Sequence, residues 1–93
     1  MIPKNIKSAH IKRAILKIRQ EGVPLKRRSR KFDLVSGCEH YPPKYVISVA
    51  NKFANGHELD AEKFSGGQET NSFLKRLGFQ IVNKTEGTAK SDL

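Results

Sequence analysis

A lysine, Lys44, stands where a helix is expected to begin, directly after Pro42 and Pro43. The start of a helix carries positive partial charge, so a cation placed there is unfavourable by about 0.3–1 kcal/mol. The free N–H groups of a helix start also attract anions such as phosphate, and the two prolines remove two of these donors. We therefore predict that Lys44 contacts phosphate in their place. The alternative is a surface lysine whose stem packs over Tyr41 or Tyr45.

A basic run precedes this helix. Lys and Arg occupy five of the six positions 26–31, and Ser29 is the exception. Such a run is usually a solvated loop. Here it leads directly into an expected strand, so both of its ends are anchored, which suits binding better than a free basic arm does. The predicted phosphate-binding residues of the run are Lys26, Arg27, Arg28, Arg30 and Lys31.

The segment 65–71, Ser-Gly-Gly-Gln-Glu-Thr-Asn, allows two interpretations. Its glycines either permit a sharp turn before a capped helix, or let backbone N–H groups come close to a phosphate. The polar side chains that follow lie in the first turns of the expected helix, where they either reach base edges or serve as caps and solvated surface. The residues predicted at a DNA interface here are Ser65, Gly66, Gly67, Gln68, Thr70 and Asn71.

Two residues just before Lys44, His40 and Tyr41, complete the predicted site. Tyr41 either stacks on a base or packs in the core with a hydrated hydroxyl, whereas Tyr45 is expected in the core. His40 is expected on the surface or beside a phosphate. His40 and Cys38 form a single Cys-x-His pair, and zinc sites need four ligands, so no metal or cofactor is predicted. The pair also lacks an oxyanion hole and an orienting acid, so the chain is not expected to be an enzyme.

Positive charge is concentrated at one end of the chain, whose formal net charge is +9. Residues 1–31 contain eleven of the eighteen Lys and Arg residues and one acid, Glu21, whereas the remaining residues contain seven bases and eight acids. The usual partner of such a basic end is a polyanion. The charge distribution therefore favours nucleic acid, with an anionic membrane surface as the weaker option.

The length of 93 residues suits one small domain with a limited core. The sequence contains no apolar run long enough to span a membrane and no leader, and its single cysteine cannot form an internal disulfide. These features predict a cytoplasmic location and no membrane partner. The expected domain covers residues 1–83, and the polar residues 84–93 are expected to form a flexible tail or the start of a linker.

Apolar periodicity predicts three helices. Residues 5–20 and 42–55 each carry an apolar stripe at i, i+3, i+4, i+7 spacing. The third helix is expected to begin with a capping box formed by Ser65 and Gln68 and to end at Gly78. Asp60 is expected to cap a short turn before it. The two stripes consist of Ile11, Ala14, Ile15, Ile18, Val46, Val49, Ala50 and Phe53.

Alternating residues predict a small sheet. Phe32 and Leu34 alternate with Lys31 and Asp33, and a Ser-Gly turn follows, which predicts a hairpin over residues 31–41. Residues 79–82 are predicted to form a final strand that joins the hairpin. The predicted fold class is α+β, a small single domain in which three main helices pack with a short β-hairpin and a C-terminal strand.

Three short motifs follow one another within residues 29–82. They are Tyr41-Pro42-Pro43-Lys44, Phe64-Ser65-Gly66-Gly67 and Leu77-Gly78-Phe79. In this order and spacing, the sequence resembles the small N-terminal module of McrA- and McrB-type modification-dependent restriction endonucleases of bacteria and archaea. The resemblance implies a DNA-binding reader domain that prefers modified cytosine, most often 5-methylcytosine. It also implies fusion, in most relatives, to a nuclease or a nucleotide-driven motor.

The chain itself contains no H-N-H nuclease pattern, no Walker A loop and no D…E-x-K pattern. A nuclease or NTPase effector is therefore expected on another domain or chain. We predict that the chain binds methylated double-stranded DNA as the recognition module of a modification-dependent restriction system, and reads the cytosine methyl in the major groove without flipping the base. The alternatives are a protein-interaction module that docks an acidic partner, and a sequence-nonspecific nucleic-acid binder, including an RNA binder.

Overall fold

The computed structural model describes residues 1–29 and 31–84. Its elements are α1 (Ser8–Glu21), η1 (Leu25–Arg27), β1 (Phe32–Ser36), β2 (Glu39–Tyr41), α2 (Pro43–Asn55), η2 (Ala61–Lys63), α3 (Gln68–Arg76) and β3 (Gln80–Asn83). This arrangement confirms the predicted α+β fold class. Within the described part, every helix is too short or too polar to cross a membrane. Arg30 and, apart from Lys84, the expected tail lie outside the described residues.

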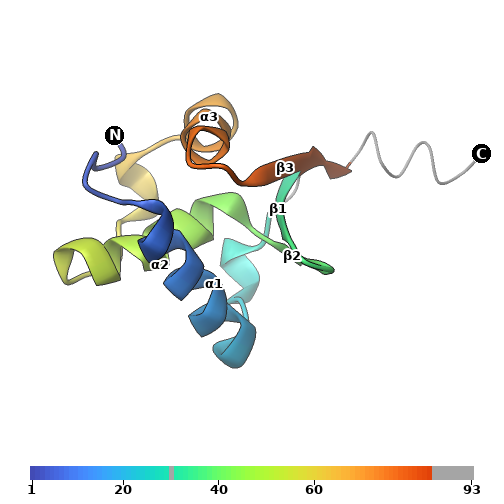
Figure 1. Ribbon diagram of the computed structural model, residues 1–93, viewed down its shortest axis with the longest axis horizontal. Coiled ribbons are helices and arrows are strands. Elements are labelled where there is room, and N and C mark those ends of the chain that lie inside the picture. Colours follow the sequence, from blue (N-terminus) through green and yellow to red (C-terminus); the bar gives the residue numbers. More distant parts are fainter. Residues whose placement is uncertain (30, 85–93) are drawn as a thin grey trace, which may run out of the picture.

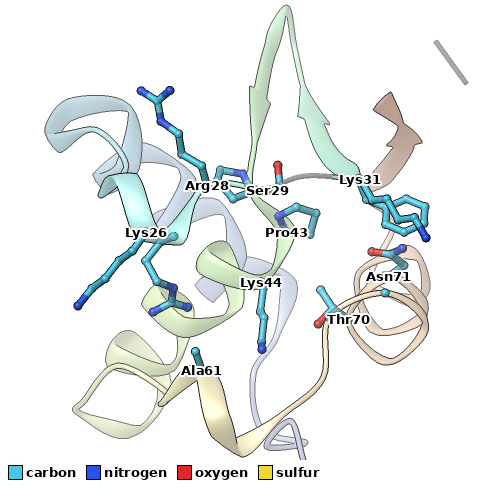
Figure 2. A pocket seen from close by; sticks show the side chains of 14 residues that line it. Lys26, Arg28, Ser29, Lys31, Pro43, Lys44, Ala61, Thr70 and Asn71 are labelled. Carbon is cyan, nitrogen blue, oxygen red and sulfur yellow. The ribbon is translucent and has the colours of Figure 1, made fainter. Parts of the chain in front are cut away.

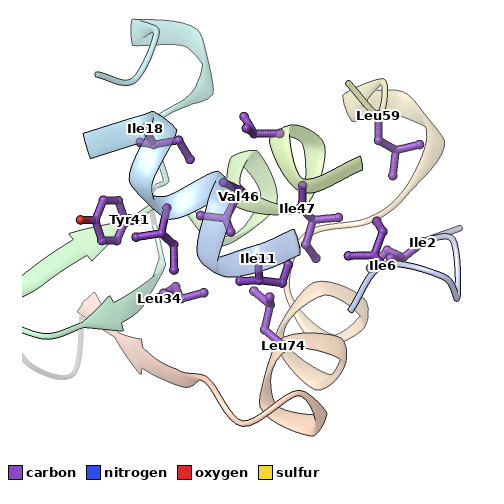
Figure 3. Close-up of a cluster of buried hydrophobic side chains, with 14 of the residues drawn as sticks. Ile2, Ile6, Ile11, Ile18, Leu34, Tyr41, Val46, Ile47, Leu59 and Leu74 are labelled. Atoms are coloured by element: carbon purple, nitrogen blue, oxygen red, sulfur yellow. The ribbon is translucent and has the colours of Figure 1, made fainter. Parts of the chain in front are cut away.

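The hydrophobic core lies between α1 and α2 and extends to the sheet and to α3 (Figure 3). The apolar stripes of α1 and α2 are buried, as their spacing predicts. Phe53 is the exception, because it is partly buried and lies under the Arg13 guanidinium, 4.7 Å from the ring centre. Leu34 of β1 and Leu74 of α3 are fully buried in the same core. The sheet and α3 are therefore held in place by one shared core.

The sheet is antiparallel and has the strand order β2-β1-β3 (Figure 1). Leu34 in β1 faces Tyr41 on one side and Ile81 on the other. The prediction that the last strand joins the hairpin is therefore confirmed. Because β1 is the central strand, the basic run enters the sheet at its middle and not at its edge.

The first helix begins three residues later than predicted. Asn5, expected at its start, instead donates a hydrogen bond of 2.7 Å from Nδ2 to Oδ1 of Asn55, at the end of α2. At the observed start, the backbone N–H of Lys7 donates to Nδ1 of His10 at 2.8 Å. The local bonds at Lys7 and the tie to α2 explain why the segment before α1 is not helical.

The predicted capping box between Ser65 and Gln68 is wrong. Gly67 is the N-cap of α3, at a φ of 64°, which places the helix start two residues later than such a box requires. The backbone N–H of Ser65 instead donates to the Glu69 carboxylate at 2.8 Å, and the Thr70 hydroxyl donates to the Ser65 carbonyl at 2.6 Å. The sharp turn at Gly67 brings these two side chains back onto Ser65, so they replace the predicted box.

Two aspartates accept hydrogen bonds from the chain beside them. The Asp60 carboxylate accepts from the Glu62 N–H at 2.9 Å, which confirms the predicted cap. Asp33 departs from the predicted alternation, because only 8 % of it is exposed. Its carboxylate accepts from the Ser29 hydroxyl at 2.6 Å and lies 3.2 Å from Nδ1 of His40. A carboxylate with such partners is tolerated inside a fold, and here it ties the basic run to the hairpin.

Candidate nucleic-acid interface

A pocket of about 370 Å³ opens between the basic run, the start of α2 and the start of α3 (Figure 2). Five cationic side chains and no carboxylate line it, so it attracts anions. We call it the basic pocket. Its lining residues are Lys26, Arg27, Arg28, Ser29, Lys31, Phe32, Pro42, Pro43, Lys44, Ala61, Gly66, Gly67, Thr70 and Asn71.

The basic pocket brings together nine of the fourteen predicted site residues. These nine are Lys26, Arg27, Arg28, Lys31, Lys44, Gly66, Gly67, Thr70 and Asn71. The fold places His40, Tyr41, Ser65 and Gln68 outside the lining, and Arg30 is not among the described residues. Sequence reasoning missed the apolar part of the lining, which includes Phe32, Pro42 and Pro43. Pro42 and Pro43 could have been predicted in the lining, since they directly precede Lys44 in the sequence.

Arg27, the last residue of η1, is held in place by two side chains of the helix α2. Its guanidinium lies 5.0 Å from the centre of the Tyr45 ring and donates a hydrogen bond of 2.7 Å to the buried Ser48 hydroxyl. Burial raises the pKa of the Tyr45 phenol and Glu58 raises it further, while Arg27 lowers it, so the ring stays neutral beneath the arginine. An arginine fixed in this way loses little side-chain freedom when it binds an anion.

Lys44 follows Pro43, the first residue of α2. Its ammonium lies 5.1 Å from the centre of the Phe64 ring. A ring face attracts a cation without neutralising it. At this position, a bound anion would interact with both the lysine and the helix N-terminus.

The family model of the ScoMcrA-like N-terminal head domain matches residues 4–83. The chain belongs to this family. Comparisons of the chain with the curated proteins and with the solved structures found no significant match. The family match confirms the resemblance carried by the three sequence motifs. The head domain is thus a DNA-binding module of a restriction-type system and not a catalytic domain.

Tyr41 belongs to the core of the head domain. It is 5 % exposed, and its hydroxyl accepts a hydrogen bond of 3.2 Å from Nε of Arg19 (Figure 3). The stacking role predicted as one option is therefore wrong, because no face of the ring is free for a base. The core role, with the hydroxyl at the edge of the core, is the one that the fold selects. Tyr45, expected in the core, packs against it only partly.

His40 lies in a second hollow next to the basic pocket, lined also by Arg28, Ser29, Asp33 and Lys84. It is exposed and faces the Asp33 carboxylate. Arg28 and Ser29 line both hollows, so His40 is close to the basic run but not inside the basic pocket. The predicted position of His40 on the surface is confirmed, and its contact with phosphate stays a prediction.

The polar residues at the start of α3 divide into three kinds. Gln68 is exposed but does not line the basic pocket. Thr70 is buried, and its hydroxyl is engaged by the Ser65 carbonyl, so it serves the turn. Asn71 lines the basic pocket and is buried, and its amide oxygen has no hydrogen-bond partner. Of these side chains, Asn71 is the one left to contact a ligand in the basic pocket.

Gly66 and Gly67 form a matched pair for testing why this turn contains two glycines. Gly67 combines a φ of 64° with a ψ of −126°, a conformation nearly confined to glycine that costs other residues roughly 1–3 kcal/mol. A Cβ on Gly66 would lie 3.8 Å from Cδ of Lys44, an ordinary contact. In urea denaturation we expect Gly67→Ala to lower the free energy of unfolding by about 1–3 kcal/mol and Gly66→Ala to change it by less than about 0.5 kcal/mol. Equal losses in the two variants would contradict this explanation.

Proposed function

We propose that the head domain binds double-stranded DNA at the basic pocket and reads modified cytosine, in the first instance 5-methylcytosine, for a modification-dependent restriction system. The observation that carries this proposal is the lining of the pocket, which has five cations and no carboxylate. The nuclease or NTPase effector is proposed to lie on another domain of the same protein or on an associated chain.

Contacts between the protein's cations and the DNA phosphate backbone supply the affinity in this proposal. Arg27 and Lys44 each lie against an aromatic ring, and neither is paired with a carboxylate in the described part of the chain. Lys26, Arg28 and Lys31 add charge from the basic run. Phosphate contacts of this kind position a protein on the duplex and carry no sequence information, so the base must be read by other groups.

An apolar part of the lining supports reading of a methyl group. Phe32, Pro42 and Pro43 line the same pocket as the cations. A methyl group at C5 of cytosine lies in the major groove, where thymine also presents its methyl, and needs only an apolar contact. The burial of Tyr41 removes one candidate for stacking on a flipped base. We therefore retain groove reading, with the base left in the stack.

The test is a fluorescence-anisotropy titration at about 150 mM salt, close to physiological ionic strength, with two identical duplexes, one unmodified and one carrying symmetric 5-methylcytosine. Burial of one methyl group is worth about 0.8 kcal/mol, so we expect the methylated duplex to bind about fourfold more tightly. Equal affinity for both would overturn the reading of 5-methylcytosine and leave a general DNA binder. Stronger competition by structured RNA than by DNA would favour the RNA alternative, and no binding to either duplex would overturn the proposal as a whole.

A further inference from the structure

Asn71 carries the one buried side-chain polar atom without a hydrogen-bond partner among residues 1–29 and 31–84, its Oδ1. The residue is 8 % exposed. Native proteins leave few such atoms unpaired, because a desolvated acceptor without a donor destabilises the fold. A group kept in this state calls for an explanation in terms of a partner that the free chain lacks.

The surroundings of Asn71 limit what that partner can be. Asn71 lines the basic pocket next to Thr70, whose hydroxyl is already engaged by the Ser65 carbonyl (Figure 2). The cations of the pocket bind groups that accept hydrogen bonds, such as phosphate. An amide oxygen needs the opposite, a ligand with an N–H or O–H donor. The complementary ligand therefore combines anionic groups with a hydrogen-bond donor, as a nucleic acid does with its phosphates and the amines of its bases.

This inference rests on the proposed function and specifies its base contact. We propose that Asn71 is the specificity-determining residue of the basic pocket, and that its Oδ1 accepts a hydrogen bond from the N4 amine of the modified cytosine. In the major groove the cytosine edge presents its N4 amine beside C5. One edge can therefore place its amine on Asn71 and its methyl group against the apolar lining formed by Phe32, Pro42 and Pro43.

The experiment is a double-mutant cycle in which two proteins are titrated against two duplexes. The proteins are the unmodified chain and Asn71→Leu, which has nearly the same shape but no polar atoms. The duplexes carry either 5-methylcytosine or 5-methyl-2-pyrimidinone, which lacks the amine, at the same position. We expect the unmodified chain to lose roughly tenfold in affinity when the amine is removed. Asn71→Leu should bind the methylcytosine duplex roughly tenfold more weakly than the unmodified chain does. Removal of the amine should then lower the affinity of Asn71→Leu by clearly less than it lowers the affinity of the unmodified chain.

Thermal unfolding separates recognition from a structural role. Since Asn71→Leu removes a desolvated, unpaired group, its melting temperature should equal or exceed that of the unmodified chain, although its DNA affinity is lower. A second variant, Asn71→Asp, keeps an acceptor. It should still discriminate between the two duplexes, although its added negative charge lowers its affinity for both. If Asn71→Leu does not fold, the discrimination by Asn71→Asp decides the question.

The proposal is overturned if Asn71→Leu discriminates between the duplexes as strongly as the unmodified chain does, or if Asn71→Asp fails to discriminate. Its failure is distinguishable from that of the proposed function. If the unmodified chain prefers methylated over unmethylated DNA and Asn71→Leu keeps both its affinity and its discrimination, the assignment of Asn71 is wrong and the reader function stands. If the unmodified chain binds methylated and unmethylated DNA equally, the reading of 5-methylcytosine fails and this inference fails with it, whereas general DNA binding stands.

Discussion

The affinity of the head domain for duplex DNA is expected to fall about a thousandfold when the salt concentration is raised from 50 to 200 mM. The basic pocket contains five cations, and the sequence of the basic run adds a sixth, Arg30, so about six phosphates are expected to be contacted. Each neutralised phosphate releases counterions, and their release becomes less favourable as the salt concentration rises. Anisotropy titrations at four or more salt concentrations measure the slope of log affinity against log salt.

A paired variant locates the charges responsible for this slope. Arg27→Ala/Arg28→Ala should reduce the slope by about two and weaken methylated and unmethylated duplexes equally, since phosphate contacts do not read sequence. The matched control is Lys52→Ala/Lys75→Ala, which removes two exposed lysines outside the basic pocket. Because Ser48 loses its partner in the paired variant, circular dichroism must show that the variant is folded. Unchanged binding by a folded paired variant would place the DNA site elsewhere.

Leu74→Ala is expected to lower the free energy of unfolding by about 3 kcal/mol, within the range of about 2–5 kcal/mol for a buried leucine. Leu74 is fully buried, and its backbone carbonyl accepts hydrogen bonds from the N–H groups of Leu77 and Phe79 where α3 ends. Such a loss is a large part of the total of roughly 5–15 kcal/mol that holds a small domain together. Urea denaturation followed by circular dichroism measures it.

Leu16→Ala is the matched control for this substitution. Leu16 lies on α1 and is 54 % exposed, so its truncation should change the free energy of unfolding by less than about 0.5 kcal/mol. Since α3 carries Thr70 and Asn71 into the basic pocket, Leu74→Ala should also weaken DNA binding where the variant remains folded. A loss of under about 1 kcal/mol in Leu74→Ala would mean that α3 is not anchored through this residue.

Local patterns in the sequence determined much of this fold. The stripe on α1 and the stripe on α2 were buried as predicted, with Phe53 as the exception. Proline at the start of α2 and glycine at the ends of α1, α2 and α3 also act through their own backbone geometry, which needs no partner from elsewhere in the chain. The order of the three motifs likewise indicated the family, because that order is a property of the sequence alone.

Tertiary structure decided which of these residues share one site. The basic run, Lys44 and the segment 66–71 are separated in sequence, and they line one pocket because the elements that carry them pack on a common core. The same packing buried Tyr41 and Asp33, which local alternation could not distinguish from exposed residues. It also left Oδ1 of Asn71 without a donor. Periodicity shows which face of a helix or strand is apolar, but the neighbour of each polar side chain depends on how distant segments meet.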